Sequence, residues 1–278
     1  MGVEGTSAAP AGGGGYLLDN RQSQAGVRFE ALASLLDPVT FRHIDSLGIG
    51  PGWRCWEVGA GGPSVPGRLA DRVGPTGAVV ATDIDTSWLP AGDDGSSGRF
   101  EVRRHDVGVD DPPGYGFDLV HARLVLVHVP GRERALRSMV DALRPGGWLL
   151  LEDADPALQP MICPDEFGPE QVLANRLRRG FRELLGGREA DLAYGRTLPR
   201  LLRAAGLEDV RAEGFFPLTS PACTVLELAT IDQVRERLVS AGIATEAEVD
   251  RHRANLVAGL VPDLATAPMI SAWGRKPV

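Results

Sequence analysis

The stretch RCWEVGAGGPSVPGRLA, residues 54–70, joins a short apolar run to a glycine-rich turn and then to a helical pattern. The apolar run ends in an acid, Glu57, and Gly59 and Gly61 follow it. Glycine adopts backbone angles that other residues avoid, and it leaves room for a ligand against the main chain. The stretch therefore predicts a strand, a ligand-binding turn and a helix, in that order.

Two classes of ligand fit a turn of this kind, and a tight turn without any ligand is a third interpretation. A dinucleotide-binding turn has the pattern G-x-G-x-x-G, with a helix N-terminus facing the pyrophosphate. In this chain the third glycine of that pattern would fall on Ser64. A ligand with a free ammonium group would instead suit the carboxylate of Glu57. The turn alone leaves these alternatives open.

Short apolar runs alternate with helical patterns on both sides of the turn. Strands are expected at Arg54–Val58, Ala78–Thr82, Phe100–Arg103, Phe117–Ala122 and Gly147–Glu152. Helices are expected at Val65–Val73, Ser87–Leu89, Leu124–His128 and Arg132–Leu143. Strands separated by helices predict an α/β fold with a parallel sheet and right-handed crossovers.

The two ends of the chain are less regular. Residues 1–15 are small and glycine-rich, so we expect a flexible tail that precedes a single domain at 16–278. Helical spacing predicts two helices before the first strand, separated at Asp37-Pro38. Later strands are expected at Val210–Phe216 and Met269–Trp273, and later helices at 164–186, Leu198–Ala205 and 224–260, with Thr245 as an N-cap.

Several segments, in their order along the chain, resemble the class I S-adenosylmethionine (SAM)-dependent methyltransferases, in particular the ubiquinone/menaquinone type. The first motif of that family is an acid followed by x-G-x-G-x-G, which matches Glu57, Gly59 and Gly61 and departs at Pro63. The segment LRPGGWLLLED, residues 143–153, resembles the family's turn and fifth strand. The segment LVHARLVLVHVPGRERAL is similar in sequence to bacterial methyltransferases of secondary metabolism.

The resemblance implies a doubly wound, Rossmann-like sheet of seven strands, mostly parallel, with an antiparallel last strand. It also implies helical lid insertions near 156–195 and 220–262, at the edge where open α/β sheets bind ligands. The implied cofactor is SAM and the implied reaction is methylation of a small molecule. The cofactor-binding residues that it implies are Tyr16, Glu57, Gly59, Gly61, Asp83, Ile84, Asp106, Val107, Ala122 and Arg123.

Each implied contact has a chemical reason. Asp83 would accept hydrogen bonds from the two ribose hydroxyls, and Glu57 would attract the ammonium of the cofactor. Ile84 would flank the adenine, and Asp106 would meet the adenine amino group with Val107 beside it. Ala122 and Arg123 would contact the methionine part. Tyr16 lies in a segment that resembles a cover over SAM.

The acceptor side is less defined. His128, just past the fourth predicted strand, is the best candidate for a general base, and a structural histidine is the competing interpretation. Asp153 and Tyr194 are candidates for acceptor contacts, and Phe215 and Phe216 are further candidates. Turn, cap or core roles compete for all four. No Cys, His and Asp spacing in the sequence is typical of a metal site.

Composition narrows the remaining classes. The net charge of −8 argues against a broad nucleic-acid surface, and no apolar run reaches the length of a membrane span. Three scattered cysteines predict neither a disulfide framework nor a metal cluster, which favours a cytoplasmic protein. We expect it to act alone or as a homodimer. A non-methylating enzyme of the same fold, such as a cyclase, and a nicotinamide-dependent oxidoreductase remain as alternatives.

Overall fold

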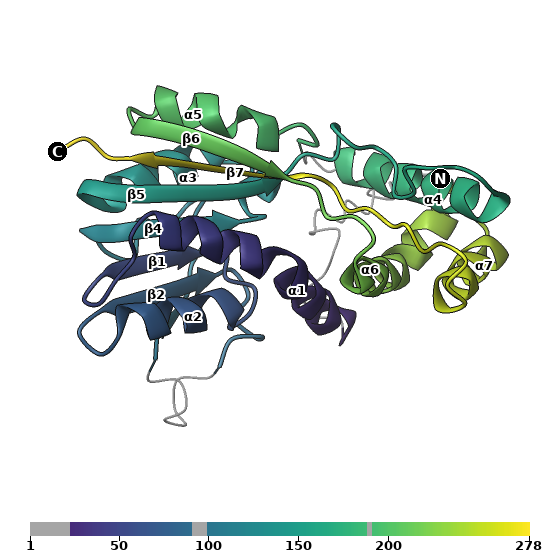
Figure 1. Cartoon of the computed structure of the whole chain (residues 1–278), viewed down its shortest axis with the longest axis horizontal. Helices are drawn as coiled ribbons and strands as arrows, with labels where there is room; N and C mark the ends of the chain where they lie inside the picture. Colours follow the sequence, from purple (N-terminus) through teal and green to yellow (C-terminus); the bar gives the residue numbers. More distant parts are fainter. Residues whose placement is uncertain (1–22, 91–98, 188–190) are drawn as a thin grey trace, which may run out of the picture.

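The computed structural model describes residues 23–90, 99–187 and 191–278. Within these residues seven strands form one sheet, in the order β3-β2-β1-β4-β5-β7-β6 (Figure 1). Strand β7 is antiparallel to both of its neighbours, and the other pairs are parallel. The predicted fold class is confirmed. The strands are β1 Arg54–Val58, β2 Ala78–Asp83, β3 Glu101–Arg104, β4 Phe117–Arg123, β5 Leu143–Ala154, β6 Glu208–Phe215 and β7 Met269–Arg275.

Helices cover both faces of the sheet because its central strands are apolar on both sides. One core cluster packs α1 and α2 against one face, around Cys55 and Leu119, and another packs α3 and α5 against the other face, around Trp56 and Val120. The helical elements are α1 Ser23–Ser46, α2 Ser64–Val73, η1 Leu126–His128, α3 Arg132–Ala142, α4 Pro169–Gly186, η2 Gly195–Thr197, α5 Leu198–Ala204, α6 Pro221–Ser240 and α7 Glu246–Val257.

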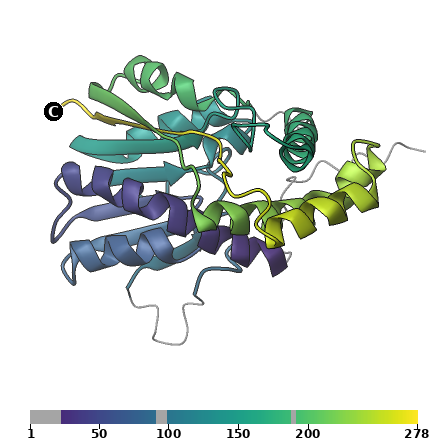
Figure 2. The ribbon, with the colours of Figure 1, turned by 45° about the vertical axis from the view of Figure 1, so that its right-hand side comes forward.

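A group of helices lies beyond one end of the sheet. There α4, α6 and α7 share a separate apolar cluster that includes Leu177, Val234 and Val249. Helix α1 runs along the sheet and then continues beside α6, as Figures 1 and 2 show. The predicted N-cap at Thr245 is confirmed, because its side chain accepts from the backbone N–H of Glu248 in a capping box. Of these helices, α1, α4 and α6 contribute residues to the wall of one cavity.

The prediction of two helices before the first strand is wrong. A single helix, α1, runs through Pro38. A proline inside a helix costs about 3 kcal/mol because it removes one hydrogen bond and crowds the preceding turn. Contacts on both sides of Pro38 offset that cost: Asp37 pairs with Arg123, and Phe41 and Ile44 are buried in the core.

Smaller differences concern element boundaries. Ser87–Leu89 forms a turn and no helix, since Pro90 follows directly. Strand β5 starts at Leu143, before the expected glycine turn, because Leu143 pairs with Phe117 ahead of a register shift. The predicted helical stretch 224–260 is two helices, α6 and α7, and Leu124–His128 contains only the short η1. The predicted flexible tail, residues 1–15, lies outside the described residues.

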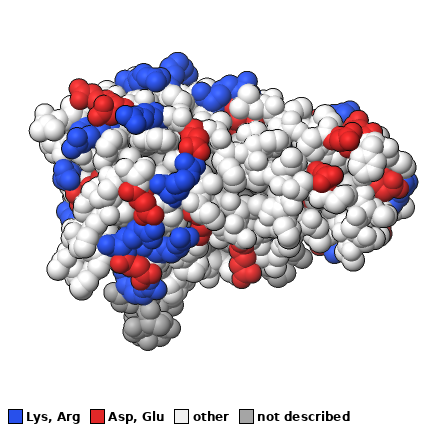
Figure 3. Space-filling model, viewed as in Figure 1, with Lys and Arg blue, Asp and Glu red and all other residues white. Residues whose placement is uncertain are grey.

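Two surface properties bear on the expected partners. Among the described residues, no helix combines the length and apolar character needed to cross a membrane. On the face drawn in Figure 3, Lys and Arg side chains are interspersed with Asp and Glu around the sheet end of the molecule. The expectation that the protein does not bind nucleic acid stays a prediction.

Candidate cofactor and acceptor site

One cavity of about 1400 Å³ starts at the carboxyl ends of the central strands and continues between α1, α4 and α6. Its first half is formed by the segments that follow β1, β2, β3 and β4, which meet at one edge because these strands are parallel. Its second half is formed by helix faces. We refer to them as the cofactor half and the acceptor half.

The glycine turn lies in the cofactor half and requires its glycines. Gly59 and Gly61 both have a φ of 63°, in the left-handed region. A Cβ on Gly59 would lie 2.3 Å from Cγ2 of Val125, and one on Gly61 would lie 3.1 Å from Cε1 of Phe29. Pro63, the odd residue of the motif, is the N-cap of α2. The turn is therefore a close-fitting backbone surface that side chains would fill.

Asp83 lies beside this turn at the end of β2. Its Oδ2 accepts the backbone N–H of Gly61 at 2.9 Å, and its Oδ1 accepts that of Asp85 at 3.0 Å. Burial raises the pKa of Asp83, and these two hydrogen bonds oppose the shift. The carboxylate is thus fixed in orientation and lines the cavity. Each oxygen keeps lone pairs for a further donor, which suits a pair of ribose hydroxyls.

Three other predicted residues line the same half of the cavity: Ile84, Asp106 and Val107. Ile84 is 57% exposed and offers an apolar surface, while Val107 is buried. Asp106 accepts the backbone N–H of Gly108 at 2.9 Å, which fixes its side chain. The structure therefore brings together the residues predicted to surround an adenosine group.

Glu57 does not line the cavity within the described structure. Its Oε2 lies 2.6 Å from Nδ1 of His121, and the other ring nitrogen, Nε2, lies 3.3 Å from Oε2 of Glu152. Burial lowers the pKa of His121, but the two carboxylates outweigh this effect and raise it to about 9. Burial raises the pKa of Glu152, but its bonds to His121 and His43 outweigh that effect and lower it. Glu57 thus belongs to a buried ion cluster that joins β1, β4 and β5.

Arg123 lines the cavity and connects β4 to α1. Its guanidinium donates to Oγ1 of Thr40 at 2.9 Å and lies 2.9 Å from Oδ1 of Asp37. Asp37 also accepts from the hydroxyl of Ser64, the first residue of α2. Ala122, predicted to contact the cofactor, is buried in the core and is not part of the cavity lining. Arg123 therefore holds the start of α2 and the middle of α1 in place.

The proposed acceptor contacts Asp153 and Tyr194 lie behind the cavity wall. Asp153 accepts backbone N–H groups of Leu126 and Val127, and burial raises its pKa to about 8. Tyr194 is buried with the guanidinium of Arg132 over its ring at 5.3 Å. Neither side chain lines the cavity, and Phe215 and Phe216 line a separate, smaller pocket of about 290 Å³. Tyr16 lies outside the described residues.

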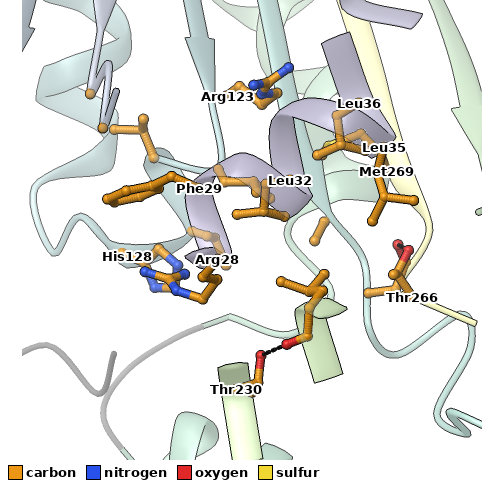
Figure 4. A pocket seen from close by; sticks show the side chains of 18 of the residues that line it. Arg28, Phe29, Leu32, Leu35, Leu36, Arg123, His128, Thr230, Thr266 and Met269 are labelled. Atoms are coloured by element: carbon orange, nitrogen blue, oxygen red, sulfur yellow. Dashed lines mark hydrogen bonds between the residues drawn. The ribbon is translucent and has the colours of Figure 1, made fainter. Parts of the chain in front are cut away.

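His128 lines the cavity next to Arg28, on the side of the cavity opposite Met269 (Figure 4). Burial and the positive charges of Arg28 and Arg132 lower the pKa of His128 to about 4. The ring is therefore neutral at pH 7 and able to accept a proton, although the low pKa makes it a weak base.

The acceptor half contains residues that the sequence prediction missed. Figure 4 shows Leu32, Leu35 and Leu36 of α1 facing the same space as Met269 and Thr266. Helices α4 and α6 each add one face, with members spaced i, i+3, i+4 and i+7. That spacing is visible in the sequence and predicts a helix face, but it does not show whether the face lines a cavity or packs in a core. The two faces are Arg178, Phe181, Arg182 and Leu185 on α4, and Cys223, Leu226, Glu227 and Thr230 on α6.

Among the residues that the structure describes, no group of three or more His, Cys, Asp or Glu side chains is placed to hold a metal ion. The three cysteines are unpaired and buried.

Known proteins that are similar to this chain in sequence are methyltransferases. Residues 56–149 match a family model described as a methyltransferase domain. A ubiquinone/menaquinone biosynthesis C-methyltransferase of Ectopseudomonas mendocina is 34% identical over 125 residues, which cover 43% of this chain and 49% of that protein. Methyltransferase str2 of Strobilurus tenacellus is 28% identical over 184 residues, which cover 64% of this chain and 62% of that protein.

Solved structures agree on the fold. Phosphoethanolamine N-methyltransferase 2 of Haemonchus contortus, solved with phosphomonomethylethanolamine and S-adenosylhomocysteine, superposes with a TM-score of 0.57 at 15% identity. The match covers 94% of this chain and 59% of that one. The chain spans about half the length of the ubiquinone/menaquinone relative that it matches.

The matched segment, 56–149, contains the glycine turn, Asp83, Asp106 and the strands that carry them. Together with the sheet order, this match shows that residues 56–149 resemble the methyltransferase domain of the class I SAM-dependent methyltransferases. The resemblance predicted from the sequence is confirmed, and SAM is the cofactor of this class. The roles of individual site residues stay predictions.

Proposed function

We propose that this chain transfers the methyl group of SAM to a small organic acceptor. The observation that carries the proposal is the continuity of the cavity, which joins the Gly59–Gly61 turn and Asp83 to an acceptor half enclosed by helices. An adenosine group held by Asp83, Ile84 and Asp106 would leave the methionine part directed along the turn toward that second half. No single residue of the site would support the proposal as strongly.

The residues present fit the cofactor. The turn lines the cavity with backbone at Gly59 and Gly61, and Asp83 offers two oriented carboxylate oxygens. When bound, SAM supplies a reactive methyl group on a sulfonium. The protein then has to align the acceptor and exclude water, and alignment alone contributes about 7–11 kcal/mol in favourable cases. The walls of α1, α4 and α6 provide that enclosure.

His128 is our proposed group for proton removal from the acceptor. It is neutral above a pH of about 4 because burial and two arginines lower its pKa. We expect His128→Ala to lower kcat by about 100-fold without changing the dissociation constant of SAM. The rate of the unmodified protein should fall as the pH falls through about 4. An unchanged kcat in the variant would assign His128 a structural role.

For the acceptor we propose only a broad class, a small metabolite. The mixed apolar and polar lining of the acceptor half suits a small metabolite. The similarity of the segment LVHARLVLVHVPGRERAL to bacterial methyltransferases favours a role in secondary metabolism, and we expect the protein in the cytoplasm. Titration calorimetry tests the cofactor first: SAM and S-adenosylhomocysteine (SAH) should bind far more tightly than NAD. A preference for NAD would contradict the proposal and favour an oxidoreductase. A mass screen for gains of about 14 Da over candidate metabolites would then identify the acceptor.

A further inference from the structure

The α4 wall of the acceptor half carries two arginines in very different settings. Arg178 donates to Oε2 of Glu227 on α6, and Nε2 of His252 lies 3.1 Å from the other oxygen of Glu227. Glu227 is only 3% exposed, and the charge of Arg178 and the bond from His252 lower its pKa against its burial. This buried group is therefore balanced in charge.

Arg182 lies one helical turn after Arg178, on the same face of α4 and in the cavity lining. Among the described residues no carboxylate lies within ion-pair distance of it, and its Nε is buried without a hydrogen-bond partner in that part of the chain. Burial and the neighbouring charge of Arg178 lower its pKa. A guanidinium in this position lacks the anion that would normally accompany it.

The other charges that line the cavity do not balance Arg182. Asp83 and Asp106 lie in the cofactor half, and Asp83 is already bound by two backbone N–H groups. Glu30, on α1, also lines the cavity, but its side chain is exposed and forms no ion pair with Arg182. The lining from these helices also includes apolar side chains, Phe181 and Leu185 from α4 and Leu226 from α6.

We propose that the methyl acceptor carries an oxyanion, such as a carboxylate, that Arg182 binds, while its apolar body lies between α1 and α6. This inference rests on the proposed function, since it concerns the molecule that receives the methyl group. The planar guanidinium offers paired N–H donors that match two oxygens of one anionic group. Arg178 cannot do the same because Glu227 occupies it. The Arg178–Glu227 pair fixes the wall against which the anion binds.

The test compares two fluorescent probes on the full chain, at saturating SAH. One is 8-anilinonaphthalene-1-sulfonate, an apolar anion, and the other is N-phenyl-1-naphthylamine, its uncharged counterpart. Arg182→Gln should weaken binding of the anionic probe by at least about tenfold and that of the neutral probe by less than about twofold. The control Arg179→Gln, which removes an exposed arginine of the same helix outside the cavity, should change neither.

Three results would overturn the inference: an equal loss for both probes in Arg182→Gln, no loss for the anionic probe, or the same loss in Arg179→Gln. Failure of the wild-type chain to bind either probe would contradict the open acceptor half that the inference requires. Calorimetry with SAH separates the two proposals. Intact SAH binding without charge selectivity removes only the oxyanion, whereas absent SAH binding removes the proposed function itself.

Discussion

The cofactor half and the acceptor half of the cavity are formed by different kinds of structure. The cofactor half comes from turns that follow parallel strands, and its contacts are made by backbone and by fixed carboxylates such as Asp83. The acceptor half comes from side chains on α1, α4 and α6, whose sequence positions are almost 200 residues apart. The first half depends on local chain geometry, and the second depends on how distant helices pack.

A buried carboxylate cluster supports each half, and the two clusters differ in their cations. Below the cofactor half, Glu57 and Glu152 share the ring of His121. Beside the acceptor half, Glu227 contacts both Arg178 and His252, so its cluster includes a cation that does not titrate. A histidine loses its charge within the accessible pH range, while an arginine does not. The two halves should therefore respond differently to substitution and to pH.

The largest effect should follow from a side chain on the cofactor turn. Gly59→Ala places a Cβ 2.3 Å from Cγ2 of Val125 at a φ of 63°. We expect a loss of at least about 3 kcal/mol in stability and a loss of SAH affinity of more than about 100-fold. Chemical denaturation and calorimetry measure the two quantities.

Gly67→Ala is the matched control, since Gly67 lies inside α2 and a Cβ there meets nothing within 4 Å. It should leave SAH binding unchanged and add about 0.5–1 kcal/mol of stability, because alanine favours a helix over glycine. Equal behaviour of the two variants would show that the turn does not require its glycine.

Alkaline pH should weaken the cluster of the cofactor half. Two carboxylates raise the pKa of His121 from 6.5 to about 9, so its charged form stabilises the folded state below pH 6.5, and this contribution is lost as the pH rises to about 9. The loss should amount to up to about 3 kcal/mol. Denaturation at pH 6.5 and 9 measures it.

The variant His121→Gln removes this contribution together with the effect of His121 on the raised pKa of Glu57. Asp153, whose pKa burial raises to about 8, reduces stability with rising pH in both proteins and so cancels in the comparison. If the variant loses as much stability between the two pH values as the unmodified chain does, the cluster is not held by a charged His121.

Asp83→Asn should lower the affinity for the cofactor moderately and leave the stability of the fold unchanged. The substitution keeps the shape of the side chain but removes the charge that would accept from two hydroxyls. Hydrogen bonds to a charged group contribute about 1.5–3 kcal/mol, so SAH should bind about ten- to hundredfold more weakly. Asp71→Asn, on the exposed side of α2, is the control. Unchanged SAH affinity in Asp83→Asn would move the ribose site elsewhere.

The smallest effect on cofactor affinity should come from the helices of the acceptor half. A Cβ on Gly180 of α4 would lie 2.1 Å from Cγ2 of Ile243, a stiff β-branched side chain. We expect Gly180→Ala to cost about 1–3 kcal/mol of stability and to leave SAH affinity unchanged. Calorimetry makes the distinction, because a large loss of SAH affinity would mean that the two halves are not independent.

Most residues predicted for the cofactor half line the cavity, because they follow strand ends in chain order. Gly59, Gly61, Asp83 and Asp106 all line the cavity where the sheet topology required them. Glu57 is not among the lining residues because its side chain contacts His121, and its role toward the cofactor stays a prediction.

The acceptor half was predicted poorly, and the reason is physical. Asp153 lies near the carboxyl end of β5, but its side chain bonds the backbone of η1, and Tyr194 is buried at the start of η2. The faces of α4 and α6 that do line the cavity show ordinary helical spacing, and periodicity does not distinguish a cavity wall from a core. The helix break predicted at Asp37-Pro38 was wrong for a similar reason, because buried contacts on both sides of Pro38 keep α1 continuous.

A crystal structure of the chain with SAH tests the central claim most directly. We predict that both ribose hydroxyls lie within hydrogen-bond distance of Asp83, that the adenine lies against Ile84 and Val107, and that the sulfur faces the acceptor half between α1, α4 and α6. SAH bound elsewhere, or with its sulfur turned away from that half, would contradict the account.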